Sequence, residues 1–180
     1  MGIFLSTTSN HNLVIELVRI FIAHSGKDEW LITPIASNLE SINVDPYLAR
    51  LEDPTPYPLP KKLDDAIRSS VAMFVFLTPN VENSKDTWDV VNWEISAAYT
   101  YKKPIYVFAE KGVNVPFMVN YITVYARYDP LSQQSLNEMV DKVQGLANTF
   151  REAEDKANAA FAIIASIFGL GLLLLVLSQD

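Results

Sequence analysis

The sequence predicts an α/β domain in which a parallel five-stranded sheet carries helices on both faces. Stretches rich in β-branched and aromatic residues alternate along the chain with stretches of helical periodicity. The strand-like stretches are almost continuously apolar, which is typical of strands buried on both faces of a parallel sheet. The 180 residues are enough for one such domain with a proper core and too few for two.

Five expected strands alternate with three expected helices. The strands are predicted over residues 13–23, 44–49, 71–77, 105–110 and 121–126. The helices are predicted over residues 30–42, 61–69 and 87–101. In the first helix, Thr33 and Pro34 fit an N-cap followed by proline at the first helical position. Segments 52–60 and 78–86 are expected to be loops, the first because its prolines suit neither a helix interior nor a central strand.

Residues 131–156 are expected to form an amphipathic helix that covers the sheet. Ser135 and Glu138 fit a capping box at its start. Apolar residues then recur at helical spacing as far as Ala153, so one face of this helix can pack on the domain.

The segment 157–178 predicts a transmembrane helix. Residues 157–179 carry no charge, and the 19 residues 159–177 are interrupted only by Ser166. At about 1.5 Å per residue they extend roughly 28 Å, close to the ~30 Å hydrocarbon core of a bilayer. A buried core helix is the alternative, but this segment is apolar on all sides and follows a domain that is already complete. Ser166 and Gly169 are a weak sign of close contact between two such helices.

The distribution of charge predicts which side of the membrane the domain occupies. Basic residues precede the segment, namely Lys142, Arg151 and Lys156, and no basic residue follows it. The positive-inside bias therefore predicts a single-pass C-terminal anchor with the domain in the cytoplasm. A secretory signal is not expected, because residues 1–30 do not show a basic region followed by an apolar run and a cleavage site. The start MGIFLS fits the myristoylation pattern, but such short patterns recur by chance and an unmodified start is favoured.

Composition excludes several kinds of site. The chain has no Cys, which rules out disulfides and thiolate metal sites, and with two histidines a His-based metal site is not expected. The net charge of −7 argues against nucleic-acid binding, which requires a basic surface. The sequence has neither a GxGxxG motif nor a Walker loop, so nothing indicates classical dinucleotide or P-loop chemistry.

Three polar segments follow predicted strands and are expected to meet at the carboxyl edge of the sheet, where open α/β sheets bind ligands. These segments are HSGKD (24–28), EDPTPYPLP (52–60) and TPNVENSKDTW (78–88). Ser25 in the first segment has no base near it except His24, its neighbour in sequence. A hydrolytic Ser-His-Asp triad is therefore not expected.

Glu94 is an anomaly in the predicted helix 87–101. Its neighbours three and four residues away are all apolar, namely Val90, Val91, Ala97 and Ala98. A carboxylate in such surroundings costs desolvation energy unless something compensates it. A functional acid explains this pattern as well as a structural acid does, whether that structural acid is buried or is partly exposed and paired with Lys or Arg. Trp88 and Trp93 lie nearby and either can stack on a flat ring, although such aromatics usually belong to the core or its rim.

Three separated segments resemble those of TIR domains, most closely those of prokaryotic TIR proteins of anti-phage, Thoeris-like defence. The segments are RIFIAHSGKD, VDPYLARLEDPTPYPLPKKLDDAIRSSVAMFVFLTPN and TWDVVNWEISAAYTYKKPIYVFAEKGV, and they occur in the family's order. The resemblance implies a flavodoxin-like TIR domain over residues 1–130, with its core at 17–130. The helix 131–156 and the membrane segment 157–178 would follow it.

The resemblance implies a pocket that binds NAD as a substrate, without a cofactor or a metal. By position, Glu94 matches the family's catalytic glutamate. The implied substrate-binding residues are Phe21, His24, Ser25, Asp53, Pro58, Trp88 and Trp93. Of these, Asp53 and Pro58 belong to the loop after the second strand, which is called the BB loop in this family.

The implied reaction is cleavage of the bond between nicotinamide and ribose, which requires stabilisation of an oxocarbenium-like ribosyl centre. Water, the adenine or a ribose hydroxyl can accept the ribosyl group, so ADP-ribose and a cyclic ADP-ribose-type signal for a downstream effector both stay open. The resemblance also implies self-association, with the pocket built across two protomers. Two alternatives remain, namely a non-catalytic membrane-tethered TIR adaptor and a different nucleoside-processing enzyme with the same kind of sheet.

Overall fold

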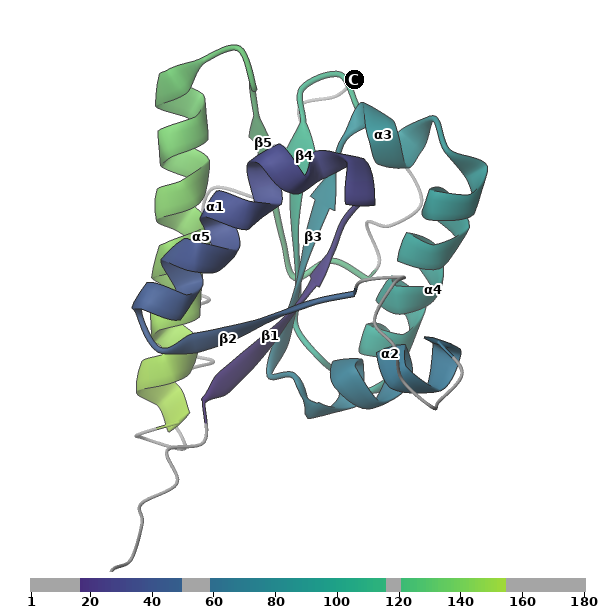
Figure 1. Ribbon diagram of the computed structural model, residues 1–180, viewed down its shortest axis with the longest axis vertical. Helices are drawn as coiled ribbons and strands as arrows, with labels where there is room; N and C mark the ends of the chain where they lie inside the picture. Colours follow the sequence, from purple (N-terminus) through teal and green to yellow (C-terminus); the bar gives the residue numbers. More distant parts are fainter. Residues whose placement is uncertain (1–16, 50–58, 116–120, 155–180) are drawn as a thin grey trace, which may run out of the picture.

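The computed structural model describes residues 17–49, 59–115 and 121–154 (Figure 1). Within these ranges five strands form one sheet in the order β2-β1-β3-β4-β5, and every neighbouring pair is parallel. The strands are β1 (Val18–Ala23), β2 (Val44–Leu48), β3 (Ala72–Leu77), β4 (Ile105–Glu110) and β5 (Val124–Tyr128). The predicted parallel five-stranded α/β fold is confirmed.

The helices lie close to where the periodicity predicts them, with two additions. They are the 3-10 helix η1 (Gly26–Asp28), α1 (Glu29–Ser41), α2 (Leu59–Ser69), α3 (Pro79–Glu82), α4 (Lys85–Thr100) and α5 (Gln133–Glu154). The additions are η1, in the polar segment 24–28, and α3, in segment 78–86, where the sequence predicts only a loop. Thr78 caps this short helix by accepting the N–H of Asn80, and Pro79 occupies its first position.

The side chains of the strands point alternately to two core layers. Figure 1 shows α1 and α5 on one face of the sheet and α2 and α4 on the other. Ile20 and Ile22 of β1 face the layer covered by α1 and α5, whereas Phe21 and Ala23 face the layer covered by α2 and α4. We call this second layer the α4-side core. Its buried residues are Phe21, Ala23, Leu63, Ala66, Ile67, Met73, Val75, Leu77, Val81, Val91, Ile95, Ala98, Ile105, Val107, Ala109, Val113 and Val115.

The start of α1 differs from the prediction. Ser25 accepts the N–H of Lys27 and caps η1, which runs directly into α1, so the helix begins at Glu29. Pro34 therefore lies inside α1 rather than at its first position, and the predicted Thr33 cap is wrong. Pro34 has no N–H to donate to the carbonyl group of Trp30, four residues earlier. Because Pro34 is exposed, water can bind this carbonyl group instead.

The start of α5 also differs. The helix is capped by Ser132, whose hydroxyl accepts the backbone N–H of Ser135 at 3.3 Å. The side chain of Ser135 instead accepts the N–H of Asp129 at 2.9 Å. The predicted capping box of Ser135 and Glu138 is therefore wrong, because Ser135 sits in the first turn and its hydroxyl binds the preceding loop.

Several predictions concern residues that the structure does not describe. The BB loop with Asp53 and Pro58, the segment 157–178 and the first 16 residues lie outside the described ranges. Within those ranges, no helix combines the length and the apolar character needed to cross a bilayer.

Candidate active site

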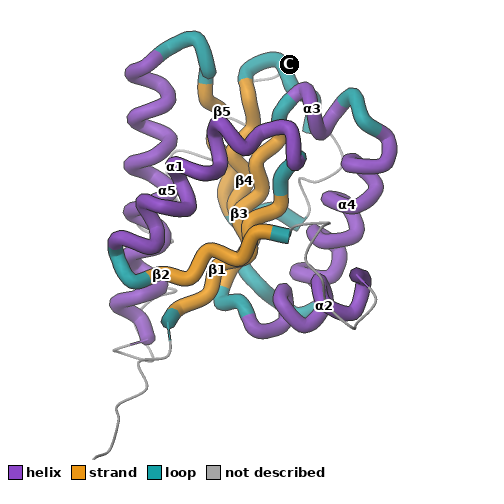
Figure 2. The backbone as a smooth tube through the Cα atoms, in the orientation of Figure 1, coloured by secondary structure: helices purple, strands orange, loops and turns teal. Residues whose placement is uncertain are grey.

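The topological switch point of the sheet lies between the carboxyl ends of β1 and β3, and we call the region outside these two ends the crevice, after the place where open α/β sheets bind ligands. These two strands are neighbours, with Ala23 paired to Val75. The chain leaves β1 towards α1 on one face of the sheet, and leaves β3 towards α3 and α4 on the other face (Figure 2). Open α/β sheets bind ligands where successive connections diverge in this way. Segments 24–28 and 78–88 therefore meet at one edge, as the sequence predicts.

Glu94 is buried in the α4-side core. Only 3% of its surface is exposed, and its helical neighbours Val91, Ile95 and Ala98 are buried beside it. Within the described part of the chain its carboxyl group has no hydrogen-bond or ion-pair partner. Burial raises the pKa of Glu94 from 4.5 to about 8, because a charge in apolar surroundings is poorly solvated. The predicted carboxyl group in an apolar face is confirmed, although Val90, one turn before Glu94, is 43% exposed.

The helix that carries Glu94 is fixed at its start by polar side chains. Ser84 caps α4 by accepting the N–H of Thr87, and Lys85 forms an ion pair with Asp89 one turn later. The polar side of α4 thus faces water, which turns the opposite side and Glu94 towards the sheet.

The two tryptophans of α4 occupy different environments. Trp88 is partly buried and packs against the α4-side core. Trp93 is 41% exposed, because it directly precedes Glu94 and so lies about 100° away around the helix. Only Trp88 therefore shares the layer of Glu94.

Phe21 and Ser25, both expected at the pocket edge, are buried. Phe21 has no exposed surface and stacks on Tyr47, with ring centroids 5.5 Å apart. Ser25 is 3% exposed, and its hydroxyl is the cap of η1. Both residues therefore shape the wall of the crevice from within.

His24, between β1 and η1, is partly exposed. Its Nδ1 atom lies 3.1 Å from the carbonyl oxygen of Ile22. This contact requires the proton to be on Nδ1, which in the neutral ring makes Nε2 the acceptor. His24 is thus held with a defined ring orientation at the carboxyl edge.

A buried polar cluster that the sequence did not predict spans the crevice. The carboxylate of Asp28 accepts hydrogen bonds from the hydroxyl of Thr78 and from Nδ2 of Asn80, each at 2.6 Å. Asp28 and Thr78 are each only 1% exposed. We call these three residues the Asp28 clamp. It joins the segment after β1 to the segment after β3. The Thr-Pro pair at 78–79 is a sequence signal for the start of α3, which carries Asn80, but the sequence does not indicate the contact with Asp28.

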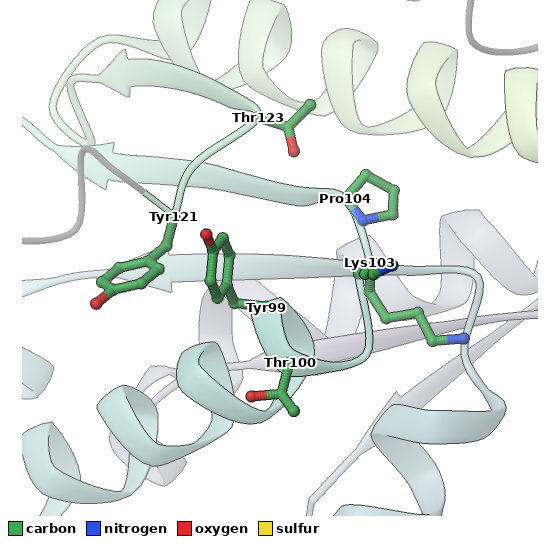
Figure 3. A pocket seen from close by; sticks show the side chains of 7 residues that line it. Tyr99, Thr100, Lys103, Pro104, Tyr121 and Thr123 are labelled. Carbon is green, nitrogen blue, oxygen red and sulfur yellow. The ribbon is translucent and has the colours of Figure 1, made fainter.

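A surface hollow of about 490 Å³ lies at the opposite edge of the sheet (Figure 3). Its lining residues are Tyr99, Thr100, Lys102, Lys103, Pro104, Tyr121 and Thr123, which surround the end of α4 and the segments before β4 and β5. None of the predicted site residues that the structure describes lines it, so this hollow is separate from them. Within the described ranges, no group of three or more His, Asp or Glu side chains is arranged to hold a metal ion.

Comparison with protein families assigns the domain. The family model for the TIR domain matches residues 20–154, which is most of the chain. The chain belongs to the TIR domain family. That family includes NAD-cleaving enzymes, and TIR domains commonly self-associate. No curated protein is similar enough to the chain to match it.

Solved structures show the same fold as this TIR domain. One is the CMP N-glycosidase BcmB of Clostridium botulinum, with 20% identity, a TM-score of 0.50, and coverage of 69% of this chain and 97% of that one. Another is a 2-deoxyribosyltransferase of Bacillus psychrosaccharolyticus, with 14% identity, a TM-score of 0.52, and coverage of 69% and 91%. The TIR domain of the Toll-related receptor TRR-2 of Hydra magnipapillata has 16% identity, a TM-score of 0.49, and coverage of 69% and 97%. At these identities the likeness concerns the fold alone.

Proposed function

We propose that this TIR protein is an NAD+ glycohydrolase or cyclase that cleaves the nicotinamide–ribose bond with Glu94 as its catalytic residue. The supporting observation is the carboxyl group of Glu94, which is 3% exposed, has no partner in the described part of the chain, and has a pKa raised to about 8. An acid kept in an apolar layer costs stability. Such a cost is typical of functional sites, where groups are held in the state that the reaction requires.

The reaction suits a single buried carboxylate. The bond between C1′ of the ribose and N1 of the pyridinium ring breaks, and its electron pair stays on N1. Nicotinamide therefore leaves as a neutral molecule without protonation, and the positive charge passes to the ribosyl ring. A carboxylate beside that ring stabilises the charge strongly, because the surroundings have a low dielectric constant. Water or a second group of the substrate then attacks C1′ and loses a proton.

The raised pKa of Glu94 is compatible with this role. In the free protein the carboxyl group is protonated at neutral pH. A pyridinium cation bound next to it favours the charged form and lowers its pKa, so substrate binding itself generates the active carboxylate. The names of the CMP N-glycosidase and the 2-deoxyribosyltransferase add support by analogy, since both denote nucleotide or nucleoside chemistry on this fold.

The remaining parts of the proposal concern the setting of the reaction. Segment 157–178 anchors the protein in the membrane with the TIR domain in the cytoplasm. The domains self-associate through the BB loop, which carries Asp53 and Pro58, and the product serves as a signal in anti-phage defence. The resemblance to defence TIR proteins and the uncharged apolar segment support these statements.

A charge-neutral substitution tests the proposal. Full-length protein in mild detergent is incubated with NAD, and nicotinamide is measured by chromatography. We expect wild type to release nicotinamide, and Glu94→Gln to lose at least about a thousandfold in kcat/KM because the charge is removed and the shape kept. Glu40→Gln, the same change at an exposed position of α1, is the matched control and keeps full activity. A wild-type protein that binds partners but releases no nicotinamide would favour the non-catalytic adaptor.

A further inference from the structure

We infer that Asp28 is a positioning residue of the active site, which acts by fixing the distance between the two walls of the crevice. This inference rests on the proposed function. One wall is the segment after β1, which carries His24 and Ser25. The other is the segment after β3, which leads through α3 to Trp88 and Glu94 on α4.

The Asp28 clamp is a closed ring of hydrogen bonds. The two oxygens of Asp28 accept from Thr78 and Asn80, and the hydroxyl of Thr78 accepts the backbone N–H of Asn80 at 3.2 Å. Asp28 and Thr78 are separated by 50 residues in sequence, so the ring fixes two distant segments. It joins them at the divergence of the two connections, where a ligand would separate the walls.

The carboxylate of Asp28 supplies an acceptor to each of the two donors in the ring. An asparagine supplies only one acceptor, so its NH₂ group fits the ring only if the hydroxyl of Thr78 turns from donor to acceptor. Asp28→Asn therefore removes the negative charge that strengthens both hydrogen bonds and reverses the direction of one of them. Within the described ranges no Lys, Arg or His forms an ion pair with Asp28. The two charge-assisted hydrogen bonds therefore compensate the desolvation of this buried charge.

The clamp is connected to Glu94 by a short and rigid path. Glu82, the last residue of α3, accepts the backbone N–H of Asn114 in the segment after β4, which fixes α3 from its other side. Two residues later Ser84 caps α4, and its carbonyl oxygen accepts the N–H of Trp88 at 2.8 Å. A change at Asp28 is thus transmitted to the start of the helix that carries Trp88 and Glu94.

Asp64 provides a matched control at the other end of α4. Its carboxylate accepts a hydrogen bond from the hydroxyl of Tyr101 at 2.6 Å and so joins α2 to the end of α4. Asp64→Asn weakens a hydrogen bond of the same length as those of Asp28, but at the edge of the sheet away from the crevice, and it also weakens the ion pair of Asp64 with Arg68. Loss of stability alone would affect both variants, whereas loss of positioning affects only Asp28→Asn.

The test combines kinetics with a spectroscopic measurement on the full chain in detergent. At temperatures where every variant is folded, we expect Asp28→Asn and Thr78→Val to lower kcat by roughly tenfold to a hundredfold, because misplacement by about 1 Å is that costly. We expect Thr78→Ser, which keeps the hydroxyl, and Asp64→Asn to retain activity near wild type. The double variant Asp28→Asn/Thr78→Val should be no worse than either single variant, because both break the same ring.

The NMR signals of the His24 ring and the Trp88 indole report the position of the walls without any reaction. We expect Asp28→Asn to shift both signals and Asp64→Asn to leave them in place. Unmoved signals in Asp28→Asn would overturn the inference, as would wild-type kcat in that variant or an equal loss in Asp64→Asn. An inactive wild type whose signals still move in Asp28→Asn would refute the proposed reaction and keep the clamp.

Discussion

Replacing Glu94 by glutamine should make the protein more stable near neutral pH, by an amount that follows from the burial of this residue. The pKa of Glu94 is raised from 4.5 to about 8, so the folded state holds the proton more tightly than the unfolded state does. The wild type therefore loses stability as the pH rises from about 4.5 to about 8, and the loss is complete above that range. An amide has nearly the shape of the neutral acid and does not titrate, so Glu94→Gln lacks this loss.

The size of the effect near neutrality follows from the distance to the unfolded pKa. About pH 7 is roughly 2.5 pH units above 4.5, the pKa of Glu94 in the unfolded state. Each of these units lowers the free energy of unfolding of the wild type by about 1.4 kcal/mol. Glu94→Gln should thus be more stable than wild type by about 3 kcal/mol at about pH 7. For a domain of this size that corresponds to roughly 10 °C in Tm.

Urea unfolding of the full-length protein in detergent, at about pH 5, 6, 7 and 8, measures this difference. The gap between Glu94→Gln and wild type should be small at the lowest pH and widen steadily, while Glu40→Gln shows no such trend. A gap independent of pH, or a less stable Glu94→Gln at neutral pH, would refute the reasoning. A gap independent of pH would show that folding does not shift the pKa of Glu94, and a less stable Glu94→Gln at neutral pH would indicate that the folded protein stabilises the ionised carboxylate.

Three further predictions concern pH, the membrane and assembly. The kcat/KM for NAD should rise with pH and level off above about pH 8, because Glu94 has to lose its proton before it can act as a carboxylate. A kcat/KM that does not change between about pH 6 and 8 would contradict this. The full chain should sediment with membranes after lysis without detergent, whereas a chain cut before Ala157 should stay in the supernatant; full-length protein in the soluble fraction would exclude the anchor. Activity of the cut domain should rise faster than linearly with its concentration, and Tyr57→Ala or Pro58→Ala should weaken it; strict linearity down to about nanomolar protein, with active loop variants, would indicate a self-contained pocket.

The sheet could be predicted because its strands are buried on both faces. β3 is buried at all six positions, and such continuous apolar runs are a strong local signal. The two edge strands, β2 and β5, are exceptions to this pattern because they are only partly buried, and β2 also contains Pro46. Pro46 is tolerated because β2 is an edge strand, and one side of an edge strand has no neighbouring strand that needs its N–H groups.

The burial of Glu94 could be predicted in the same way, since apolar residues surround it at helical spacing. The sequence could not separate Trp88 from Trp93, because both lie within two turns of the acid and α4 has apolar residues on two sides. Packing against the sheet decides the orientation. It turns Val91 and Ala98 inward and leaves Val90 and Trp93 exposed.

The Asp28 clamp and the helix starts could not be predicted, because they depend on hydrogen bonds that the local pattern does not specify. Asp28 reads as part of a glycine-containing turn, and its partners lie 50 and 52 residues away. At α5 two serines three residues apart both fit a cap. Only the contact of Ser135 with Asp129 decides in favour of Ser132.

Release of nicotinamide from NAD by wild type and by Glu94→Gln, measured side by side in the full-length protein, tests the central claim most directly. The account predicts steady release by wild type and by Glu40→Gln, and almost none by a folded Glu94→Gln whose stability at neutral pH exceeds that of wild type. Equal release by wild type and Glu94→Gln would remove Glu94 from the reaction. The absence of release from an assembled wild-type protein would contradict the proposed activity itself.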